Sequence, residues 1–591
     1  MAQFLRSVAW LTCLTVLSSA LKADNRIQYD VRQYGAVGDG KTIDTDAINR
    51  AIQAASHAGG GMVVFNAGTY ASYSIHLESN ITLYLGAGVT LLAAEPSLDG
   101  KQGYDNPELN TFNPYQDFGH SHWHNSLIWG ENLQNVSIIG PGKIYGYGLS
   151  RGLSHAVRDL TPEEHEKYWT LVLKKFDKDN KGYLNHYERG ILMNEIRQKT
   201  DPELLSHVLP QAMYAPKPRS FIPGAFGYPS VNDTQANGVG NKAIALKNCR
   251  NVTLKDFTIY HGGHFGILAM ATDNMTIDNL TIDTNRDGMD IDCCVNVRVS
   301  NCSVNSPWDD GICLKSSFAL GYKRACENIT ITNCNVSGYL EGTLLDGTRQ
   351  KRYLGSEETG ATGRIKFGTE SNGGYKNITV SNCTFDYCRG LALEIVDGGT
   401  MEDVTVSNLS MRDIQNSAIY IRLGERNREP HTANGVVRRI NISNIVGYNI
   451  DPRFGSIIEG SPDCYIKDVS LSNIRLAFRG GGTSEEAAVI PHENLKTYPE
   501  PEFHGVMPAY GCFVRYVKNI EMHDIFFSYI KTDLRPAISL QSVTGAEFRH
   551  IKAQHAMSQP IFALHSVTSF IAKDVNDLAD ISKDEAKDET Y

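Results

Sequence analysis

Short stretches of alternating apolar and polar residues recur from residue 251 almost to the end of the chain. One unit reads Asn-Val-Thr-Leu-Lys-Asp-Phe-Thr-Ile from Asn251 and returns with few changes from Asn274 and Asn296. Alternation with a period of two is typical of half-buried β-strands, and Asn, Asp and Gly are typical of turns. Self-similarity of this kind predicts that each unit is one coil of a stacked repeat protein.

The sixth residue of each unit is Asn or Asp and serves as a register mark. The marks are Asp256, Asn279, Asn301, Asn333, Asn382, Asn408, Asn444, Asn473 and Asp524. The shortest steps between marks define one coil of roughly 22 to 26 residues, and the longer steps indicate coils with inserted loops. Stacked coils pair each strand with the coils above and below, so the pattern predicts an all-β fold, a single-stranded right-handed parallel β-helix. Leucine-rich repeats are the main alternative, but their leucine spacing is absent here.

The marks also predict details of the stack. Each Asn or Asp is expected at a corner, where its side chain can hydrogen-bond to the backbone of a neighbouring coil. Cys302, Cys334 and Cys383 each follow a mark, and they are expected to form an interior column rather than disulfide bridges. The terminal coil of such a stack must be covered. The helical pattern of residues 48–55, after Asp44, predicts a capping helix there.

The predicted β-helix domain comprises residues 26–575, followed by a charged, solvated tail at 576–591. Residues 1–20 have one cation at Arg6, an apolar run and then Ser-Ser-Ala, which is typical of a secretory signal peptide, so a secreted or periplasmic protein is expected. Without Cys13 an odd number of cysteines, eleven, remains, so at least one thiol is expected to stay free. A formal net charge of −10 argues against a nucleic-acid partner, and the sequence predicts no membrane span.

Residues 158–208 interrupt the repeat with a charged, glycine-poor segment that is predicted to be helical. Within it, residues 177–188 resemble one EF-hand loop, with Gly182 at the sharp bend. The predicted calcium ligands are Asp177, Asp179, Asn185 and Glu188. Lys181 stands where the loop usually supplies an oxygen ligand, so the insertion is either a calcium site or a structural helix-loop-helix.

Acidic residues gather in two neighbouring coils, in Asn-Arg-Asp-Gly-Met-Asp-Ile-Asp from Asn285 and in Trp-Asp-Asp-Gly from Trp308. Counting eight residues from successive marks predicts one column, which consists of His264, Asp287, Asp309 and Glu341. Adjacent coils lie about 4.8 Å apart, so Asp287, Asp309 and the neighbouring Asp310 are expected to disturb one another's pKa. Glycoside hydrolysis requires such a pair, one protonated acid and one ionised base. Acids on a solvated corner are the structural alternative.

These motifs resemble those of glycoside hydrolase family 28, the polygalacturonase family, as does the entrance Asp-Val-Arg-Gln-Tyr-Gly-Ala-Val-Gly-Asp-Gly from Asp30. The family's Asn-Thr-Asp corresponds to residues 285–287, with Arg286 for Thr, and its Asp-Asp corresponds to residues 309–310. The resemblance implies an inverting mechanism in which Asp309 is the general acid and Asp287 and Asp310 activate water. Inverting geometry requires carboxyl groups about 6.5–9.5 Å apart, more than one coil step.

Two further family motifs are altered. The Gly-His-Gly segment is replaced by Gly-Arg-Ile-Lys at residues 363–366, before a stretch containing Glu370 that resembles exo-acting members. The family's Arg-Ile-Lys, one coil later, falls on Ala-Leu-Glu at residues 392–394 and lacks both cations. The predicted substrate-binding residues are His264, Lys315, Glu341, Arg364, Lys366, Glu370, Glu394 and Arg422. Their cations favour an anionic sugar, with salt bridges to the acids as the alternative.

The sequence thus predicts a secreted, exo-acting, inverting hydrolase of pectic bonds, of galacturonan or rhamnogalacturonan type, with an acidic plant cell-wall oligo- or polysaccharide as its partner. No cofactor is expected for catalysis, and calcium is expected only at the EF-hand-like loop. A polysaccharide lyase on the same fold would use calcium and an Arg or Lys base. A carbohydrate-binding β-helix without catalytic activity would need aromatic platforms rather than the acids.

Overall fold

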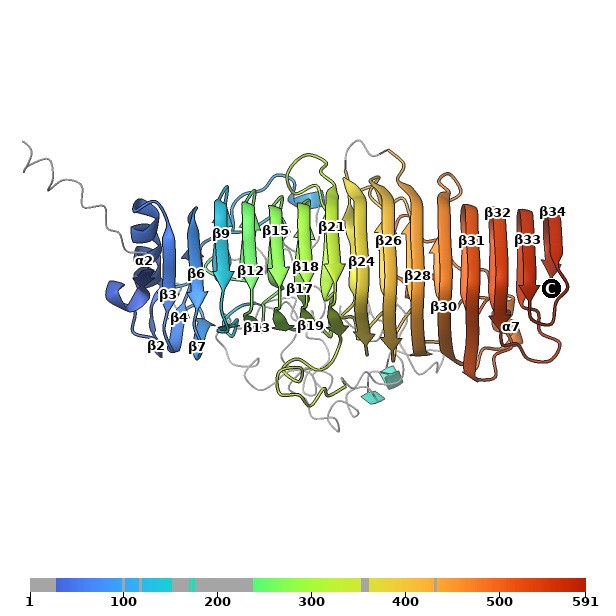
Figure 1. Ribbon diagram of the computed structural model, residues 1–591, viewed down its shortest axis with the longest axis horizontal. Coiled ribbons are helices and arrows are strands. Elements are labelled where there is room, and N and C mark those ends of the chain that lie inside the picture. Colours follow the sequence, from blue (N-terminus) through green and yellow to red (C-terminus); the bar gives the residue numbers. More distant parts are fainter. Residues whose placement is uncertain are drawn as a thin grey trace, which may run out of the picture.

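The computed structural model describes residues 28–97, 101–115, 120–150, 170–171, 173–175, 237–351, 361–429 and 433–591. These residues contain 34 strands joined in one continuous sheet that winds along the long axis of the molecule (Figure 1). Most strands pair in parallel with the strand one coil away, for example Ile267 with Met289 and Met289 with Ile312. The predicted parallel β-helix is therefore confirmed.

This continuous sheet has three faces around each coil, which are called the first, second and third sheets below. Strands of the first sheet are β5 (Ile75–His76), β8 (Ile128–Glu131), β11 (Lys242–Lys247), β14 (Phe265–Met270), β17 (Asp287–Asp292), β20 (Ile312–Ser316), β23 (Ile365–Ser371), β25 (Leu391–Ile395), β27 (Ile419–Leu423) and β29 (Ser456–Glu459). Strands of the second sheet are β1 (Gln28–Asp30), β3 (Gly61–Phe65), β6 (Ile81–Leu85), β9 (Gln134–Ile139), β12 (Arg250–Lys255), β15 (Asp273–Asp278), β18 (Val295–Ser300) and β21 (Cys326–Thr332). Strands of the third sheet are β2 (Asp39–Ile43), β4 (Gly68–Ser72), β7 (Val89–Ala93), β10 (Lys143–Tyr145), β13 (Thr258–Tyr260), β16 (Thr281–Asp283), β19 (Ser303–Asn305) and β22 (Asn335–Ser337).

The second and third sheets merge in the later coils, where one long strand spans both. These strands are β24 (Gly374–Asp386), β26 (Thr400–Arg412), β28 (Val436–Ile450) and β30 (Ile466–Gly480). β31 (Cys512–Lys531), β32 (Ile538–Ala553) and β33 (Phe562–Val575) also include the position of the first sheet, since Ser456 of β29 pairs with Cys512.

Apolar side chains of every coil point inward and stack in columns. Met289, Ile312 and Ile365 stand in register on the first sheet, and each is fully buried. Burying an aliphatic side chain of this size stabilises the fold by about 1.5–3 kcal/mol. Cys302, Cys334 and Cys383 are buried and free, which confirms the predicted cysteine column, and the other eight cysteines of the described chain are also free.

Asparagine ladders connect the corners of the coils. Asn279 donates from Nδ2 to Asp256 (2.8 Å), and Asn473 donates to Asn444 (2.9 Å). The register marks have a left-handed backbone, such as φ 58° at Asn301, which Asn tolerates better than most residues. The expected bond to backbone was wrong, because in-register stacking places one Asn directly above another and their side chains bond to each other.

The two ends of the stack are closed differently. Helix α2 (Thr45–His57) buries Ala47, Ile48, Ala51, Ile52 and Ala55 over the first coil, which confirms the predicted cap. The solvated tail predicted at residues 576–591 was wrong, since β34 (Ile581–Thr590) pairs antiparallel with β33 and buries Ala586. Backbone hydrogen bonds hold this strand, so its charged side chains can stay in water.

Long loops between coils cover the first sheet. One of them, residues 481–511 between β30 and β31, contains the short helix α7 (Ser484–Ala487) and the 3-10 turn η4 (Pro501–His504). Two further 3-10 turns are η1 (Val31–Tyr34) and η2 (Asn113–Tyr115). In the part of the chain that the structure describes, no helix is long and apolar enough to cross a membrane. The predicted signal peptide lies outside the described residues.

Candidate active site

Three aspartates meet at the corner where two successive coils enter the first sheet. Asp287 begins β17, and Asp309 and Asp310 lie just before β20. One carboxylate oxygen from each lies within 4.8 Å of those of the other two. The structure therefore brings together the three carboxylates that the sequence singled out.

The predicted column of His264, Asp287, Asp309 and Glu341 was wrong, because the structure does not pair these residues with one another in register. Phe265, not His264, stands opposite Asp287. Met289 pairs with Ile312, and counting back two residues on both strands places Asp287 opposite Asp310 rather than Asp309. The cause is the turn between β16 and β17, residues 284–286, which is one residue shorter than the turn at 261–264 in the preceding coil.

Glu341 does not join the aspartates. The inserted loop after β22 carries it over the third sheet, where its carboxylate pairs with Nδ1 of His261. The eight-residue count fails here because the coil is interrupted before the chain returns to the first sheet at β23. His264 lies one residue before β14, in register with Arg286, and burial together with the charge of Arg286 lowers the pKa of this histidine well below its usual value.

The three carboxyl groups have different surroundings. Asp287 is buried, and burial together with the charges of Asp290 and Asp309 raises its pKa well above the usual value. Burial alone would also raise the pKa of Asp310, but Lys366 and Arg364 outweigh it and lower that pKa. The Asp309 side chain is 23% exposed, the most accessible of the three, and Arg286 Nη2 lies 2.5 Å from its Oδ2. The surroundings thus shift the pKa values of Asp287 and Asp310 in opposite directions.

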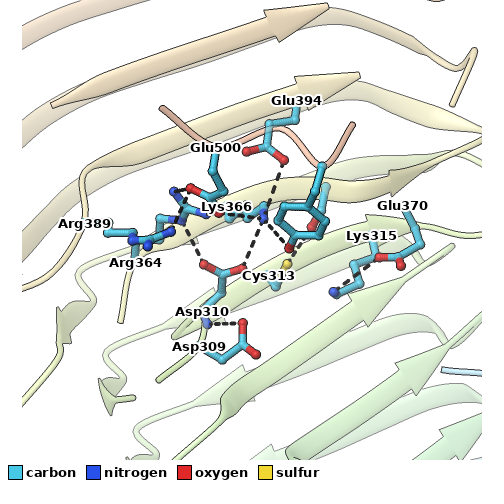
Figure 2. Close-up of polar contacts among 12 residues, drawn as sticks. Asp309, Asp310, Cys313, Lys315, Arg364, Lys366, Glu370, Arg389, Glu394 and Glu500 are labelled. Carbon is cyan, nitrogen blue, oxygen red and sulfur yellow. Dashed lines mark hydrogen bonds and ion pairs between the residues drawn. The ribbon is translucent and has the colours of Figure 1, made fainter. Parts of the chain in front are cut away.

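A cluster of cations flanks Asp310 (Figure 2). Arg364 donates from Nε to Asp310 Oδ1 (2.8 Å), and Lys366 Nζ lies 3.6 Å from Asp310 Oδ2. Lys366 is also 3.6 Å from Glu394 Oε2, and burial raises the pKa of Glu394 to about 8 despite that cation. Arg364, Lys366 and Glu394 therefore lie at the site, as predicted, but each is already paired with protein.

Lys315 and Glu370 form a second buried network beside the aspartates. Lys315 Nζ lies 3.5 Å from Asp290 Oδ2 and 3.4 Å from Glu370 Oε2. Burial alone would lower the pKa of Lys315, but the charges of Asp290 and Glu370 hold it well above its usual value. His120 Nε2 is 2.8 Å from the same oxygen of Asp290. The positive charge of Lys315 partly offsets the rise in the pKa of Asp287, so this network also influences the three aspartates.

Arg422 lies farther along the stack and does not contact the aspartates. It stands in register between Glu394 and Glu459, and its Nη1 is 2.8 Å from Glu459 Oε1. Arg515 pairs with the same oxygen at 2.7 Å. For Arg422 the salt-bridge alternative describes the structure.

Four residues of the site have no counterpart in the prediction. They are His120, Arg389, Tyr498 and Glu500. His120 comes from the loop before β8, and Tyr498 and Glu500 come from the loop 481–511, neither of which occupies a repeat position. One sequence signal could have indicated the second loop, since the step of 51 residues from Asn473 to Asp524 is the longest between marks.

The predicted EF-hand-like insertion is not placed by the structure. Its ligands Asp177, Asp179, Asn185 and Glu188 lie outside the described residues. Within the described ranges, the group of carboxylates that could hold a metal ion is Asp287, Asp309 and Asp310. Arg286, Arg364 and Lys366 already place three cations around those carboxylates.

Comparison with known proteins agrees with the fold. The family model "Right handed beta helix region" matches residues 227–350, and the model "Rhamnogalacturonase A/epimerase, pectate lyase-like" matches residues 28–142. An exo-poly-alpha-D-galacturonosidase of Dickeya chrysanthemi is 24% identical over 297 residues, which are 49% of this chain and 42% of that protein. The chain thus matches less than half the length of this curated relative. Alginate lyase 7 of Azotobacter vinelandii is 42% identical over 71 residues, 11% of this chain and 8% of that protein.

Solved structures show the same architecture. A family 28 exopolygalacturonase of Yersinia enterocolitica superposes with a TM-score of 0.54 at 18% identity, covering 90% of this chain and 79% of its own. An exopolygalacturonase of Thermotoga maritima gives a TM-score of 0.51 at 18% identity, and the superposition covers 85% of this chain and 92% of that protein. The structure and the matching family model together show a right-handed parallel β-helix. The similarity to exopolygalacturonases supports the resemblance to glycoside hydrolase family 28.

Proposed function

We propose that the protein is a glycoside hydrolase that cleaves pectic glycosidic bonds with Asp287, Asp309 and Asp310. The observation that carries the proposal is the approach of these three carboxylates within 4.8 Å, with opposite shifts in the pKa of Asp287 and Asp310. Hydrolysis of a glycosidic bond uses one carboxyl group that gives a proton to the leaving oxygen and one that activates water or attacks the sugar.

The surroundings suggest how these roles are divided. Burial next to other acids raises the pKa of Asp287 and so favours its protonated form. Asp309 lies beside it and is the carboxyl group that a leaving oxygen can reach, so in our proposal this pair supplies the proton. Asp310, kept ionised by Lys366 and Arg364, acts on water. The family resemblance implies inversion at the anomeric carbon.

Replacing Asp309 by Asn tests the proposal, because removing an acid–base group typically costs about 10²–10⁴-fold in rate. Asp256→Asn is the matched control, since Asp256 is exposed and lies on the corner ladder between the second and third sheets rather than at the corner of the three aspartates. Hydrolysis of pectic oligosaccharides that survives Asp309→Asn unchanged would overturn the assignment. NMR of the first product anomer separates inversion from retention, and the cleavage pattern separates exo from endo action.

A lyase is the second candidate, favoured by one observation. Three close carboxylates can hold a divalent cation, and the similarity to alginate lyase 7 covers a short part of the chain. Against it, Arg286, Arg364 and Lys366 already compensate these acids. An unsaturated product that absorbs ultraviolet light and appears only with calcium would establish the lyase. Binding of pectic oligosaccharides without any cleavage would instead indicate a carbohydrate-binding β-helix.

Export to the periplasm or outside the cell belongs to the same proposal, since polymeric pectin is an extracellular substrate class. It rests on the signal-like pattern of residues 1–20. Mass spectrometry of the protein purified from culture medium or periplasm would show cleavage after the small residues near Ala20, and an intact Met1 in a protein retained inside the cell would contradict export.

A further inference from the structure

Glu500 places a protein carboxylate in the middle of the cation cluster beside Asp310 (Figure 2). Its Oε2 accepts from Arg364 Nη1 (3.1 Å) and lies 2.8 Å from Arg389 Nη1. Its Oε1 accepts from Arg364 Nη2 and lies 3.6 Å from Lys366 Nζ. Burial alone would raise the pKa of Glu500, but Arg364, Arg389 and Lys366 lower it to about 2, so the group is ionised at neutral pH.

The three cations contact Glu500 as they would contact the carboxylate of a bound uronate, but here the carboxylate belongs to the protein. A guanidinium fork that binds both oxygens of a carboxylate, helped by a second guanidinium and an ammonium, is the usual way to recognise such a group. Here both oxygens of Glu500 are already taken.

The charges of the cluster balance without a ligand. Arg364, Lys366 and Arg389 carry three positive charges, and Asp310, Glu500 and Glu502 carry three negative ones, with Glu502 Oε1 2.8 Å from Arg389 Nη2. Glu394, whose pKa is about 8, is mostly neutral at pH 7. A substrate carboxylate next to Asp310 would therefore bring an uncompensated buried negative charge, which proteins rarely tolerate.

Glu500 is held firmly by its own segment. Glu502 accepts from Asn416 Nδ2 (2.9 Å) as well as pairing with Arg389. His504 lies 2.6 Å from the carbonyl oxygen of His492 and 3.0 Å from the Tyr420 hydroxyl. On the other side, Lys366 donates to the Tyr498 hydroxyl (3.2 Å). These bonds on both sides make Glu500 a built part of the site.

We propose that Glu500 determines specificity: it occupies the place of a uronate carboxylate, so that the subsite beside Asp310 takes a neutral sugar unit of a pectic chain and excludes a uronate. This inference rests on the proposed function and narrows its substrate. A neutral unit presents a hydroxymethyl or methyl group where a uronate presents a carboxylate, and it adds no charge to the balanced cluster.

A matched pair of probes tests the inference. An α-1,4-linked galacturonate trimer and the same trimer with its carboxylates reduced to hydroxymethyl groups differ only at C6, where the charge is lost. We expect the wild-type protein to hydrolyse the reduced trimer with a kcat/KM at least about tenfold above that for the acid. Glu500→Gln, which removes the built-in anion, should shift this ratio toward the acid by about tenfold or more. Glu486→Gln, a surface change on the same loop, should leave the ratio as in the wild type.

Binding measured by ligand-observed NMR with galacturonic acid and with galactose separates this inference from the proposed hydrolysis. Galacturonic acid should bind Glu500→Gln and not the wild type. A wild type that cleaves neither trimer but keeps this binding preference would refute the hydrolysis of this linkage and support the specificity. A wild type that binds or cleaves the acid as well as the neutral probe would overturn the role of Glu500. That wild-type comparison decides the question even if Glu500→Gln, checked by circular dichroism, does not fold.

Discussion

Replacing Glu394 by Gln should reduce the loss of folding stability that occurs as the pH rises. Glu394 is fully buried at the edge of the cation cluster, and burial raises its pKa to about 8 from an ordinary value of 4.5. Between these two values the folded protein keeps a proton on Glu394 that the unfolded chain releases. Stability therefore falls as pH rises through this window, because the unfolded state binds fewer protons than the folded state. Gln cannot titrate, so the folding stability of the variant does not fall through this window on account of residue 394.

The size of the effect follows from the same pair of values. Each pH unit in the window contributes about 1.4 kcal/mol, so the whole window amounts to roughly 5 kcal/mol of unfolding free energy. A chain of 591 residues has an unfolding entropy of about 1.2 kcal/mol per kelvin. About 3 pH units of this window lie between pH 5 and pH 9, so the Tm of Glu394→Gln relative to wild type should be about 3 °C more favourable at pH 9 than at pH 5.

Thermal unfolding followed by circular dichroism at one fixed scan rate measures this difference. Glu402→Gln is the matched control, because Arg438 and Arg439 lower the pKa of Glu402 outside this cluster, so the group does not take up a proton between pH 5 and pH 9. Its Tm should be lower than that of wild type by the same amount at pH 5 and pH 9. If Glu394→Gln also differs from wild type equally at the two pH values, Glu394 does not hold the proton and the account of the cluster is wrong.

Three further predictions concern other parts of the molecule. The alkaline limb of the pH–rate profile should report loss of the Asp287 proton, since the pKa of Asp287 is raised, and it should be absent or moved in whatever activity Asp287→Asn retains. Asn301→Ala should lower the unfolding free energy by about 1–2 kcal/mol in chemical denaturation, and Asn301→Gly by less, because φ is 58° there; equal losses would argue against backbone strain. Calorimetric titration with calcium should give a heat of binding that Glu188→Gln removes, whereas no heat at millimolar calcium would make the insertion a structural helix-loop-helix.

The fold could be predicted from the sequence because one geometric rule repeats. Every coil has the same alternation and the same left-handed corner, as at Asn279 and Asn301, so a short unit read many times determines the architecture. The capping helix could be predicted for the same reason, since a stack has an open end. The strand β34 could not, because antiparallel pairing through the backbone leaves no apolar periodicity in its charged sequence.

Within the site, the residues that could be predicted are those that occupy positions of the repeat. Asp287, Asp309 and Asp310 were identified because they lie on successive coils, and their pairing was wrong by one place because a single turn is shorter than its neighbours. Glu500 escaped prediction because it arrives on a long loop whose path over the sheet depends on tertiary contacts. The sequence showed cations near the acids, but their partners decide what those cations can bind.

The strand β34 also bears on how the molecules behave toward one another. Each parallel coil is a template for the next, so an uncovered β33 would present its backbone donors and acceptors to any chain able to pair there, including a second copy. β34 runs the opposite way and carries charges of both signs from Lys583 to Glu589, so it offers no parallel edge of matching register. Because α2 covers the other end of the stack, a protein shortened before Ile581 should associate in pairs through its exposed β33 edges rather than grow into filaments, and size-exclusion chromatography would show the doubled mass.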